Sequence, residues 1–271
     1  MEYLDIDRIH AALLDILKYF DAFCRRNGLR YSLSGGTMIG AVRHKGFIPW
    51  DDDADIMMPR PDYNRFLELF NAQSDGRYMV ISHEIGRNGG SWYIKCYSKV
   101  EDTTTVSIEE GLRGIAQFGL NIDIFPVDGV PDNPAEQKKF CNAVRRYKRR
   151  VVLRQRPLWR LFQGPPLAHL QSRLHSLEYW AKKCDDFMCT YDYDTAHYAG
   201  AIGGLHGVDE VHPKQVFEEY ADYDFEGVKL MGIKDAHAYL SKIFGDYMQL
   251  PPERERSGKH KLLVYYKDKK D

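Results

Sequence analysis

The sequence has no long apolar run, almost no net charge and no regular cysteine spacing. Its 38 lysines and arginines balance 39 aspartates and glutamates, so no nucleic-acid partner is expected. No apolar run approaches the roughly 18 residues of a membrane-spanning helix, and no signal segment is visible. The five cysteines lack C-x-x-C spacing, which favours reduced thiols in the cytoplasm over a zinc site.

The length and apolar content fit either one large core or one core with an appended helical region. Apolar residues make up 44% of the 271 residues and charged residues 28%. Spacings of three and four predict helices, and alternation predicts short strands. The expected helices are 5–27, 38–43, 63–70, 168–189 and 239–248, and the expected strands are 29–33, 78–82, 91–100 and 119–126.

A turn of small residues, Ser34-Gly35-Gly36-Thr37, separates the strand 29–33 from the helical segment 38–43. Glycines between a strand and a helix let phosphate oxygens approach the amides at the positive helix end. Basic residues follow, of which Arg43 suits bidentate phosphate contact best. The candidate phosphate-binding residues here are Gly35, Gly36, Thr37, Arg43, His44 and Lys45.

An acidic stretch follows a break at Pro49-Trp50. Side chains at i and i+2 of a strand share a face, so Asp53 and Asp55 should point together while Ala54 faces the core. Carboxylates beside an apolar wall need a cation to stay ionised, and a divalent metal is the natural partner. Ordinary loop chemistry is the alternative, because glycine pairs and acidic turns are common.

Two further strands carry polar residues that bear on the same site. Asp123 lies on the strand 119–126 between isoleucines, and becomes a third carboxylate if that strand neighbours the first pair. It could instead cap the strand end before the turn that follows. Lys95, on the strand 91–100 with Lys99 on the same face, offers a point charge to phosphate or simply lies in solvent.

The segment 134–160 contains ten lysines and arginines and no acidic residue after Glu136. Such a block is typical of a solvated helix face. Because Trp159 and Phe162 lie at its end, docking on an anionic membrane surface or a polyanionic acceptor is the competing interpretation.

The stretch GGTMIGAVRHKGFIPWDDDADIMMPRPDY closely resembles the signature of the LicD family. The resemblance extends to NIDIFPVDGVP, to Phe225-Glu226-Gly227 and to FGDYMQLPP. It implies an α+β fold, with a nucleotidyltransferase-like mixed sheet flanked by helices and an appended basic helical region. The implied domains are a catalytic core 1–133, a helical insertion 134–190 and a C-terminal α/β region 191–271 that completes the core and the acceptor site.

LicD members look like enzymes that move phosphorylcholine or a related phospho-alcohol from a CDP-linked donor. Fukutin and fukutin-related protein are similar enzymes for ribitol phosphate. The resemblance implies transfer to a sugar hydroxyl of a lipid-linked glycan or teichoic-acid precursor, with release of CMP, in the cytoplasm or at the inner membrane face.

The resemblance also implies site roles. Mg²⁺, or Mn²⁺, would be held by Asp53, Asp55 and Asp123, with Asp123 acting as a ligand or as a base. Substrate contacts are expected from Trp50, Asp52, Arg256 and His260. Members often have two adjacent histidines where this chain has His260 alone.

Two other functions use the same residues differently. A nucleotidyltransferase that attaches a nucleoside monophosphate and releases pyrophosphate needs the same carboxylates. A glycan- or membrane-binding protein with a degenerate site does not need them, and their presence argues against it.

Overall fold

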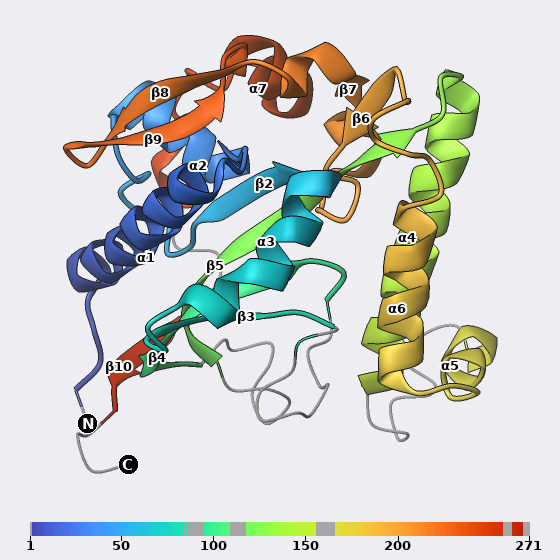
Figure 1. The fold of residues 1–271 in the computed structure, drawn as a ribbon, viewed down its shortest axis with the longest axis horizontal. Helices are drawn as coiled ribbons and strands as arrows, with labels where there is room; N and C mark the ends of the chain where they lie inside the picture. Colours follow the sequence, from blue (N-terminus) through green and yellow to red (C-terminus); the bar gives the residue numbers. More distant parts are fainter. Residues whose placement is uncertain are drawn as a thin grey trace. The chain divides into compact units, whose positions relative to one another are not determined.

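A computed structural model describes residues 2–83, 85, 95–108, 118–155, 166–256 and 262–267. The mixture of helices and strands confirms the expected α+β class (Figure 1). Within these ranges, no helix combines the length and apolar character needed to cross a bilayer. His260 and Trp159 lie outside the described residues, as do most of the residues in the first part of the expected strand 91–100.

The chain forms two compact units. The first unit comprises Met1–Val80, Lys99–Phe125 and Gln215–Asp271, and the second comprises Ile81–Ser98 and Pro126–Lys214. The domain borders suggested by the sequence stay a prediction.

Helix α1 (Ile6–Asn27) opens the first unit where the apolar spacing predicted it. The Asp5 side chain accepts a hydrogen bond from the backbone N–H of Arg8 at 2.9 Å, and Gly28 ends the helix in the left-handed conformation, with φ 62°. Its apolar face is buried, including Phe20 and Phe23. These rings meet Phe66 and Phe70 of α3 (Arg60–Gln73), and the ring centroids lie 4.8–6.1 Å apart.

The sheet of the first unit runs in the order β1-β2-β5-β4-β10. β1 is antiparallel to β2, and β10 is antiparallel to β4, with Leu33 opposite Ile56 and Leu263 opposite Ile108. β3 (Tyr78–Ile81) pairs with β4 off this path. In this order, the five strands span β1 Ser32–Leu33, β2 Asp55–Pro59, β5 Phe118–Val130, β4 Ser98–Ile108 and β10 Leu263–Tyr266.

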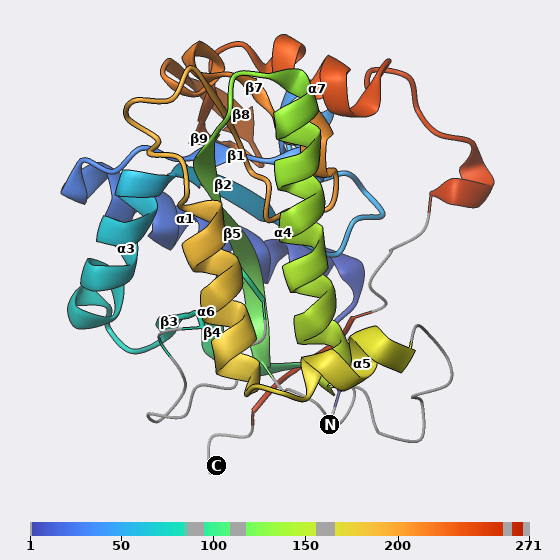
Figure 2. The same cartoon turned by 90° about the vertical axis from the view of Figure 1, so that its right-hand side faces the viewer.

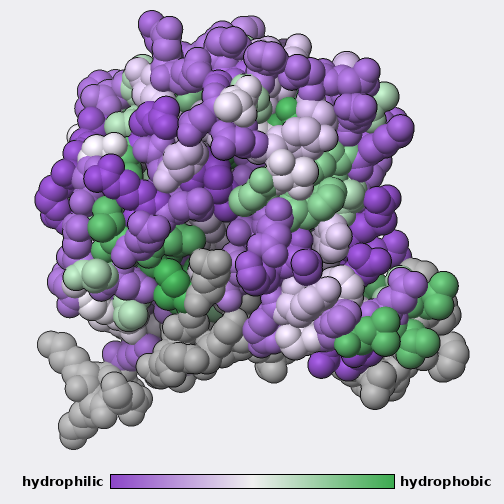
Figure 3. Space-filling view, turned by 45° about the vertical axis from the view of Figure 1, so that its right-hand side comes forward, coloured by the Kyte–Doolittle hydropathy of each residue, from purple (hydrophilic) through white to green (hydrophobic). Residues whose placement is uncertain are grey.

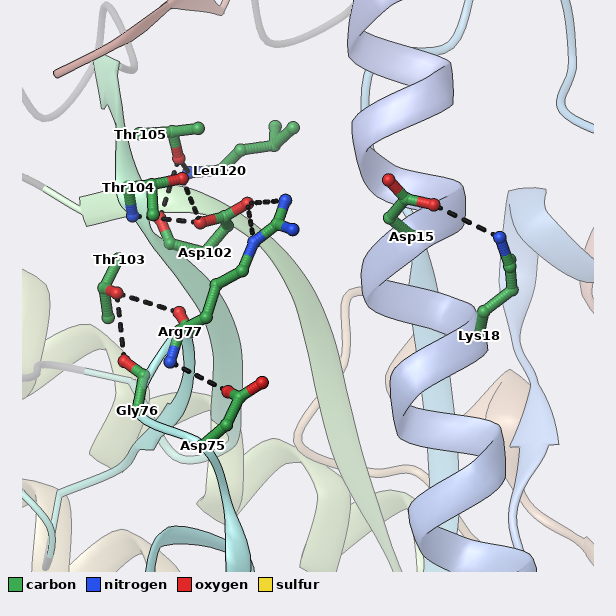
Figure 4. A network of polar contacts seen from close by, with 10 residues as sticks. All are labelled: Asp15, Lys18, Asp75, Gly76, Arg77, Asp102, Thr103, Thr104, Thr105 and Leu120. Carbon is green, nitrogen blue, oxygen red and sulfur yellow. Dashed lines mark hydrogen bonds and ion pairs between the residues drawn. The ribbon is translucent and has the colours of Figure 1, made fainter. Parts of the chain in front are cut away.

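A buried acid fixes the course of β4. Asp102 is fully buried and accepts hydrogen bonds from the Arg77 guanidinium at 2.9 and 3.2 Å (Figure 4). Its other oxygen accepts from the backbone and hydroxyl of Thr104 at 2.9 and 2.6 Å. The Thr105 hydroxyl then accepts from the N–H of Leu120 on β5 at 2.7 Å. Each carboxylate oxygen is therefore satisfied, which a buried charge requires.

A hairpin of β8 (Tyr220–Phe225) and β9 (Val228–Ile233) follows later in the chain. Its turn is Glu226-Gly227, and both residues have positive φ, 48° and 77°, as a tight hairpin turn requires. The Glu226 side chain accepts from the N–H of Phe47 at 3.0 Å. A Cβ on Gly46 would lie 2.0 Å from Glu226 Oε1, so only glycine fits there. The Phe225-Glu226-Gly227 element thus anchors the loop that precedes Trp50.

The second unit is built on α4 (Pro134–Gln155) and α6 (Leu177–Met188), which lie side by side (Figures 1 and 2). The last residues of β5 pair with β6 (Tyr198–Gly200), which pairs with β7 (His212–Pro213). The buried core residues of this unit are Cys96, Val130, Phe140, Cys141, Val144, Cys184, Met188, Ile202 and Val211.

Several expected elements have different bounds, and three of them matter most. The helix expected over 168–189 is two helices, α5 (Pro166–Ser172) and α6, because Ser176 caps a new helix by accepting from the N–H of Tyr179 at 3.1 Å. The tail helix α7 (Ala236–Phe244) begins earlier, at the Asp235 cap, and ends at Gly245. β4 begins at Ser98, so Lys95 precedes the strand on which it was expected.

All five cysteines are free thiols, and only Cys189 is exposed. Cys96 and Cys184 lie together, and burial and this neighbouring thiol raise the pKa of Cys184. The Lys148 ammonium lies near both and donates to the carbonyl of Gly203 at 2.5 Å. Burial lowers the pKa of Lys148.

Candidate active site

The predicted carboxylates lie where β2 meets β5 and α2 (Gly35–Ile39). Asp55 is the first residue of β2, and the N–H of Asp123 on β5 donates to the carbonyl of Ala54 at 2.9 Å. β5 is therefore the neighbour of the acidic strand, as the interpretation of Asp123 required. Leu120, Ile122 and Ile124 are buried, so Asp123 occupies the opposite face of β5.

The carboxyl group of Asp55 interacts electrostatically with the other two predicted carboxylates. Burial raises the pKa of Asp55 well above its usual range, and the charges of Asp53 and Asp123 raise it further. The Lys99 ammonium acts in the opposite direction on the same carboxyl. Burial and the neighbouring carboxylates thus both disfavour the ionised form of Asp55.

Lys99 on β4 is the cation of this site. Its side chain is buried, and it donates to the Asp123 carboxylate and to the Asn121 amide oxygen, the latter at 2.8 Å. Two residues of β5 on the same face thus hold one ammonium group. Because a buried ammonium needs such partners, Lys99 and Asp123 fix one another's orientation.

The glycine pair is the start of α2 rather than a turn before a helix at Met38. Gly35 has φ 49°, and Ser34 precedes it as the N-cap residue. A Cβ on Gly36 would lie 2.9 Å from Asp51 Oδ2, and one on Gly35 would lie 3.6 Å from Asp55 Oδ2. The pair therefore gives carboxylates, and any group that replaces them, close access to the backbone.

Neighbouring side chains hold this helix start in place. The Thr37 hydroxyl accepts from the N–H of Asp55 at 2.8 Å, which joins α2 to β2. The Tyr239 hydroxyl of α7 lies 3.1 Å from Ser34 Oγ and accepts from the N–H of Gly35 at 3.3 Å. The backbone at the glycine pair is thus fixed from both sides.

The acidic side chains of the site are all aspartates, and their carboxylate oxygens are the kind of ligand that a hard divalent cation prefers. Among the described residues, no three histidine, cysteine, aspartate or glutamate side chains are arranged to hold a metal ion together. Mg²⁺ commonly binds through one or two carboxylates plus phosphates of the substrate, without a complete protein cage. The raised pKa of Asp55 marks the group that gains most from such a cation.

Four other candidates form a second group, which we name the Trp50 cluster: Arg43, His44, Trp50 and Arg256. The Arg256 guanidinium lies 5.6 Å from the Trp50 ring centroid, and the His44 ring meets Trp50 edge-on at 6.3 Å. Arg43 Nε donates to His44 Nε2 at 3.0 Å.

Two guanidinium groups share the Trp50 cluster. Burial and the nearby Arg256 charge lower the pKa of Arg43, and burial and Arg43 lower the pKa of His44. Arg43 Nη1 donates to the Tyr247 carbonyl at 2.6 Å, and Arg256 Nε donates to the Pro251 carbonyl at 2.8 Å. Backbone carbonyls thus hold both guanidinium groups, and two like charges held close together are suited to binding an anion.

The remaining candidates lie elsewhere. Asp52 is buried and accepts from the N–H of Leu262 at 3.2 Å, a contact that ties its loop to β10. Lys45 is exposed, and its carbonyl accepts from the N–H of Glu226 at 2.8 Å. Lys95 belongs to the second unit, where its ammonium lies 5.4 Å from the Tyr97 ring centroid.

Comparison with known proteins shows the family to which this chain belongs. Residues 28–133 match a family model described as the LicD/FKTN/FKRP nucleotidyltransferase domain. Over 269 residues the chain is 31% identical to the lipopolysaccharide cholinephosphotransferase LicD of Haemophilus influenzae, covering 98% of this chain and 99% of that protein. The chain belongs to the LicD family.

Other LicD-related proteins match shorter segments. The ribitol 5-phosphate transferase FKRP of Homo sapiens is 35% identical over 63 residues, covering 23% of this chain and 13% of FKRP. Mannosyltransferase regulator 4 of Saccharomyces cerevisiae is 27% identical over 146 residues, 51% of this chain and 11% of that protein. The matched LicD domain contains Asp53, Asp55, Asp123 and Lys99.

Sequence reasoning left four residues out of the LicD site: Lys99, Asn121, Ser34 and Tyr239. Lys99 was placed on a strand with Lys95 but not assigned to the site. Its signal was a charged residue directly before the buried Val100-Glu101-Asp102 stretch. Asn121 lies two residues before Asp123 and therefore on the same face of the strand. Tyr239 lies about two hundred residues beyond Ser34, and no local pattern links the two.

Proposed function

We propose that this protein is a metal-dependent transferase that moves phosphorylcholine, or a related phospho-alcohol, from a CDP-alcohol to a sugar hydroxyl. The acceptor is a cell-surface glycan or a lipid-linked precursor such as that of teichoic acid, and CMP is released. The observation that carries this proposal is the match along nearly the whole chain to a lipopolysaccharide cholinephosphotransferase. We place the reaction on the cytoplasmic side of the membrane.

The cluster of carboxylates supports the proposed metal-dependent transfer. Asp53 and Asp55 would hold Mg²⁺ or Mn²⁺, which neutralises charge on the diphosphate as CMP leaves. Asp55 is suited to this role because its carboxyl is buried among other acids. The glycine pair lies against carboxylate oxygens, and its lack of side chains would let phosphate oxygens approach the backbone as closely.

The Trp50 cluster supports donor binding. Arg43 and Arg256 present guanidinium groups that are fixed by backbone carbonyls. Planar guanidinium groups match pairs of phosphate oxygens, so these two would bind the diphosphate of the donor. The Trp50 ring offers a flat apolar surface beside them, on which a base or the choline cation can lie.

Asp123 and Lys99 support the proton transfer. The acceptor hydroxyl oxygen attacks the phosphorus that carries the alcohol, the bond from that phosphorus to the CMP oxygen breaks, and the hydroxyl proton must leave. Asp123 would accept the proton, with one of its oxygens bound to Lys99 and the other facing the acceptor. The same ammonium then stabilises charge near the transferred group.

Product analysis tests the proposal. The full-length protein is incubated with Mg²⁺ and CDP-choline, CDP-ribitol or CDP-glycerol, with and without glycan acceptors, and CMP is measured. We expect CMP from one donor, increased by an acceptor and abolished by chelation. Release of pyrophosphate from a nucleoside triphosphate, without CMP from any CDP-alcohol, would establish the nucleotidyltransferase alternative instead.

Donor binding gives an independent readout. Thermal stabilisation by the preferred CDP-alcohol should exceed that by CMP and should disappear on chelation if the donor binds through the ion. Equal stabilisation with and without chelator would contradict the metal-bridged binding mode.

A further inference from the structure

Helix α5 has its polar and apolar faces reversed. Leu167 and Leu170 are 68% and 60% exposed, and Leu174, just beyond the helix end, is 72% exposed. His169 and Ser172, between them in sequence, are 2% and 0% exposed. A surface helix of a globular protein normally places leucines inside and polar residues outside.

The polar contacts of α5 lie within the helix and with α6. Within the helix, the Ser172 hydroxyl donates to the carbonyl of His169 at 2.6 Å. The indole N–H of Trp180 on α6 donates to the carbonyl of Ser172 at 2.9 Å. The leucines therefore contribute little to holding the helix, and their side chains remain available to another apolar phase. Figure 3 shows hydrophobic residues gathered at the lower right, over α5.

Basic side chains lie on the neighbouring helix. α4 packs against α5, and Arg154 Nε donates to the His175 carbonyl at 3.1 Å, which links the end of α4 to the segment after α5. Arg145, Arg149 and Val152 follow the i, i+4, i+7 spacing of one helix face, and all three are exposed. We name the exposed residues Arg145, Arg149, Val152, Leu167, Leu170 and Leu174 the α5 patch.

Basic character extends along the helix that carries these arginines. α4 contains eight lysines and arginines and a single acidic residue, Glu136, in its first turn. The Arg150 guanidinium lies 4.8 Å from the Trp180 ring centroid, so its charge also lies at the α4–α6 contact. The helix that packs against α5 is thus strongly basic.

We propose that the α5 patch docks on the surface of an anionic lipid bilayer. Exposed leucines beside arginines are what an interfacial segment needs: the apolar side chains enter the headgroup boundary while the arginines meet lipid phosphates. A second copy of the chain is a poorer occupant, because pairing two such patches would bring arginine against arginine. The inference goes beyond the proposed transfer and does not depend on it, although it would place the enzyme beside a lipid-linked acceptor.

Vesicle flotation tests the inference on the full chain without donor or metal. We expect the protein to float with vesicles of phosphatidylcholine and phosphatidylglycerol, but not with phosphatidylcholine alone, and to float less as salt is raised. Substituting Leu167→Gln, Leu170→Gln and Leu174→Gln together should weaken binding about 100-fold, since each leucine loses its transfer from water. These side chains are exposed, so circular dichroism should be unchanged.

Matched controls separate the patch from general surface effects. Leu205 is 88% exposed in the same unit but outside the patch, so Leu205→Gln should float like the parent protein. Arg145→Gln with Arg149→Gln should weaken binding about 30-fold, at about 1 kcal/mol per charge near an anionic surface. Lys229→Gln with Lys234→Gln removes the same charge from an exposed hairpin of the first unit and should have a smaller effect.

Three results would overturn the inference. They are flotation of the triple leucine variant at the parent level, equal flotation with both vesicle types, and a concentration-dependent dimer that the leucine substitutions abolish without any vesicle binding. The last would assign the patch to a second copy. CMP release is a separate measurement, so loss of either activity would be distinguishable from loss of the other.

Discussion

The two units of this protein place residues in costly environments of opposite kinds, buried acids in the first and exposed leucines in the second. In the first unit, acids are withdrawn from water: Asp102 with a complete set of partners, and Asp55 beside further carboxylates. In the second unit, leucines of α5 lie in water while His169 is buried. The buried Asp55 and the exposed leucines both cost folding free energy, and we propose that a cation relieves the first cost and an apolar surface the second.

The contrast between Asp102 and Asp55 separates structure from chemistry. Asp102 has hydrogen bonds to both oxygens from Arg77 and Thr104, so it needs nothing further. Asp55 has neighbours of its own sign, which raise its pKa. A buried acid among acids is the better marker of a functional site.

Asp55→Asn should have the largest effect. It removes the carboxylate that a cation would need most, so transfer should fall about 1,000-fold. CMP release at saturating donor measures this. Asp102→Asn should instead reduce stability while the folded fraction keeps its activity, and the reverse pattern would contradict the division drawn here.

The same Asp55→Asn substitution should stabilise the protein when divalent ions are removed. Because folding raises the pKa of Asp55, the folded state holds that proton more tightly than the unfolded chain does. The ionised carboxyl therefore costs stability above its unfolded pKa of about 3.9, increasingly until the pH passes its folded pKa. Thermal unfolding with chelator should show a higher midpoint for the variant at neutral pH, with the difference shrinking towards pH 4.

Lys99→Met should lower activity about 10- to 100-fold, the usual loss when a residue that orients a ligand is removed. The substitution keeps the length of the side chain but leaves Asp123 without its ammonium partner. We expect the pH dependence of turnover to change as well, which a packing defect alone would not cause. Lys18→Met, at an exposed ion pair with Asp15, is the control and should leave turnover unchanged.

Arg256→Gln should raise the KM for the CDP-alcohol about tenfold with a smaller change in kcat, because it removes one phosphate contact. Steady-state kinetics measures the split. Arg254→Gln is the matched control, since Arg254 is exposed two residues away. Equal effects of the two substitutions would remove the Trp50 cluster from the donor site.

The smallest effect is expected from His169→Leu in the second unit. Within the described residues, neither ring nitrogen of His169 has a hydrogen-bond partner, so leucine should stabilise the protein by about 1 kcal/mol. Denaturant unfolding measures this, with His175→Leu as an exposed control. Destabilisation by His169→Leu would mean that the imidazole has a role that its contacts do not reveal.

The sequence predicted those parts of the fold that depend on local patterns. α1 follows from its three- and four-residue spacing, and β5 from alternation around Asp123. The adjacency of β2 and β5 was a condition of the site and is observed. The break between α5 and α6 was missed because the Ser176 cap acts through one hydrogen bond within a sequence that is otherwise helical.

The sequence singled out the acids of the candidate site but not its lysine. Two aspartates at i and i+2 carry a local signal, Asp123 stands out as an acid between isoleucines, and the LicD resemblance points to the same three. The contact of Lys99 with Asp123 depends on the register between β4 and β5, which no short motif specifies. The Trp50 cluster likewise brings together Arg43 and Arg256, which are far apart in the sequence, so no short motif predicts their contact. The roles of these residues stay predictions.

The distribution of the thiols has a practical consequence. Cys24, Cys96, Cys141 and Cys184 are buried, whereas Cys189 at the end of α6 is exposed. A maleimide dye should therefore modify one position in the folded protein without mutagenesis. A fluorophore attached there would lie on the second unit, and its emission could report membrane docking in real time.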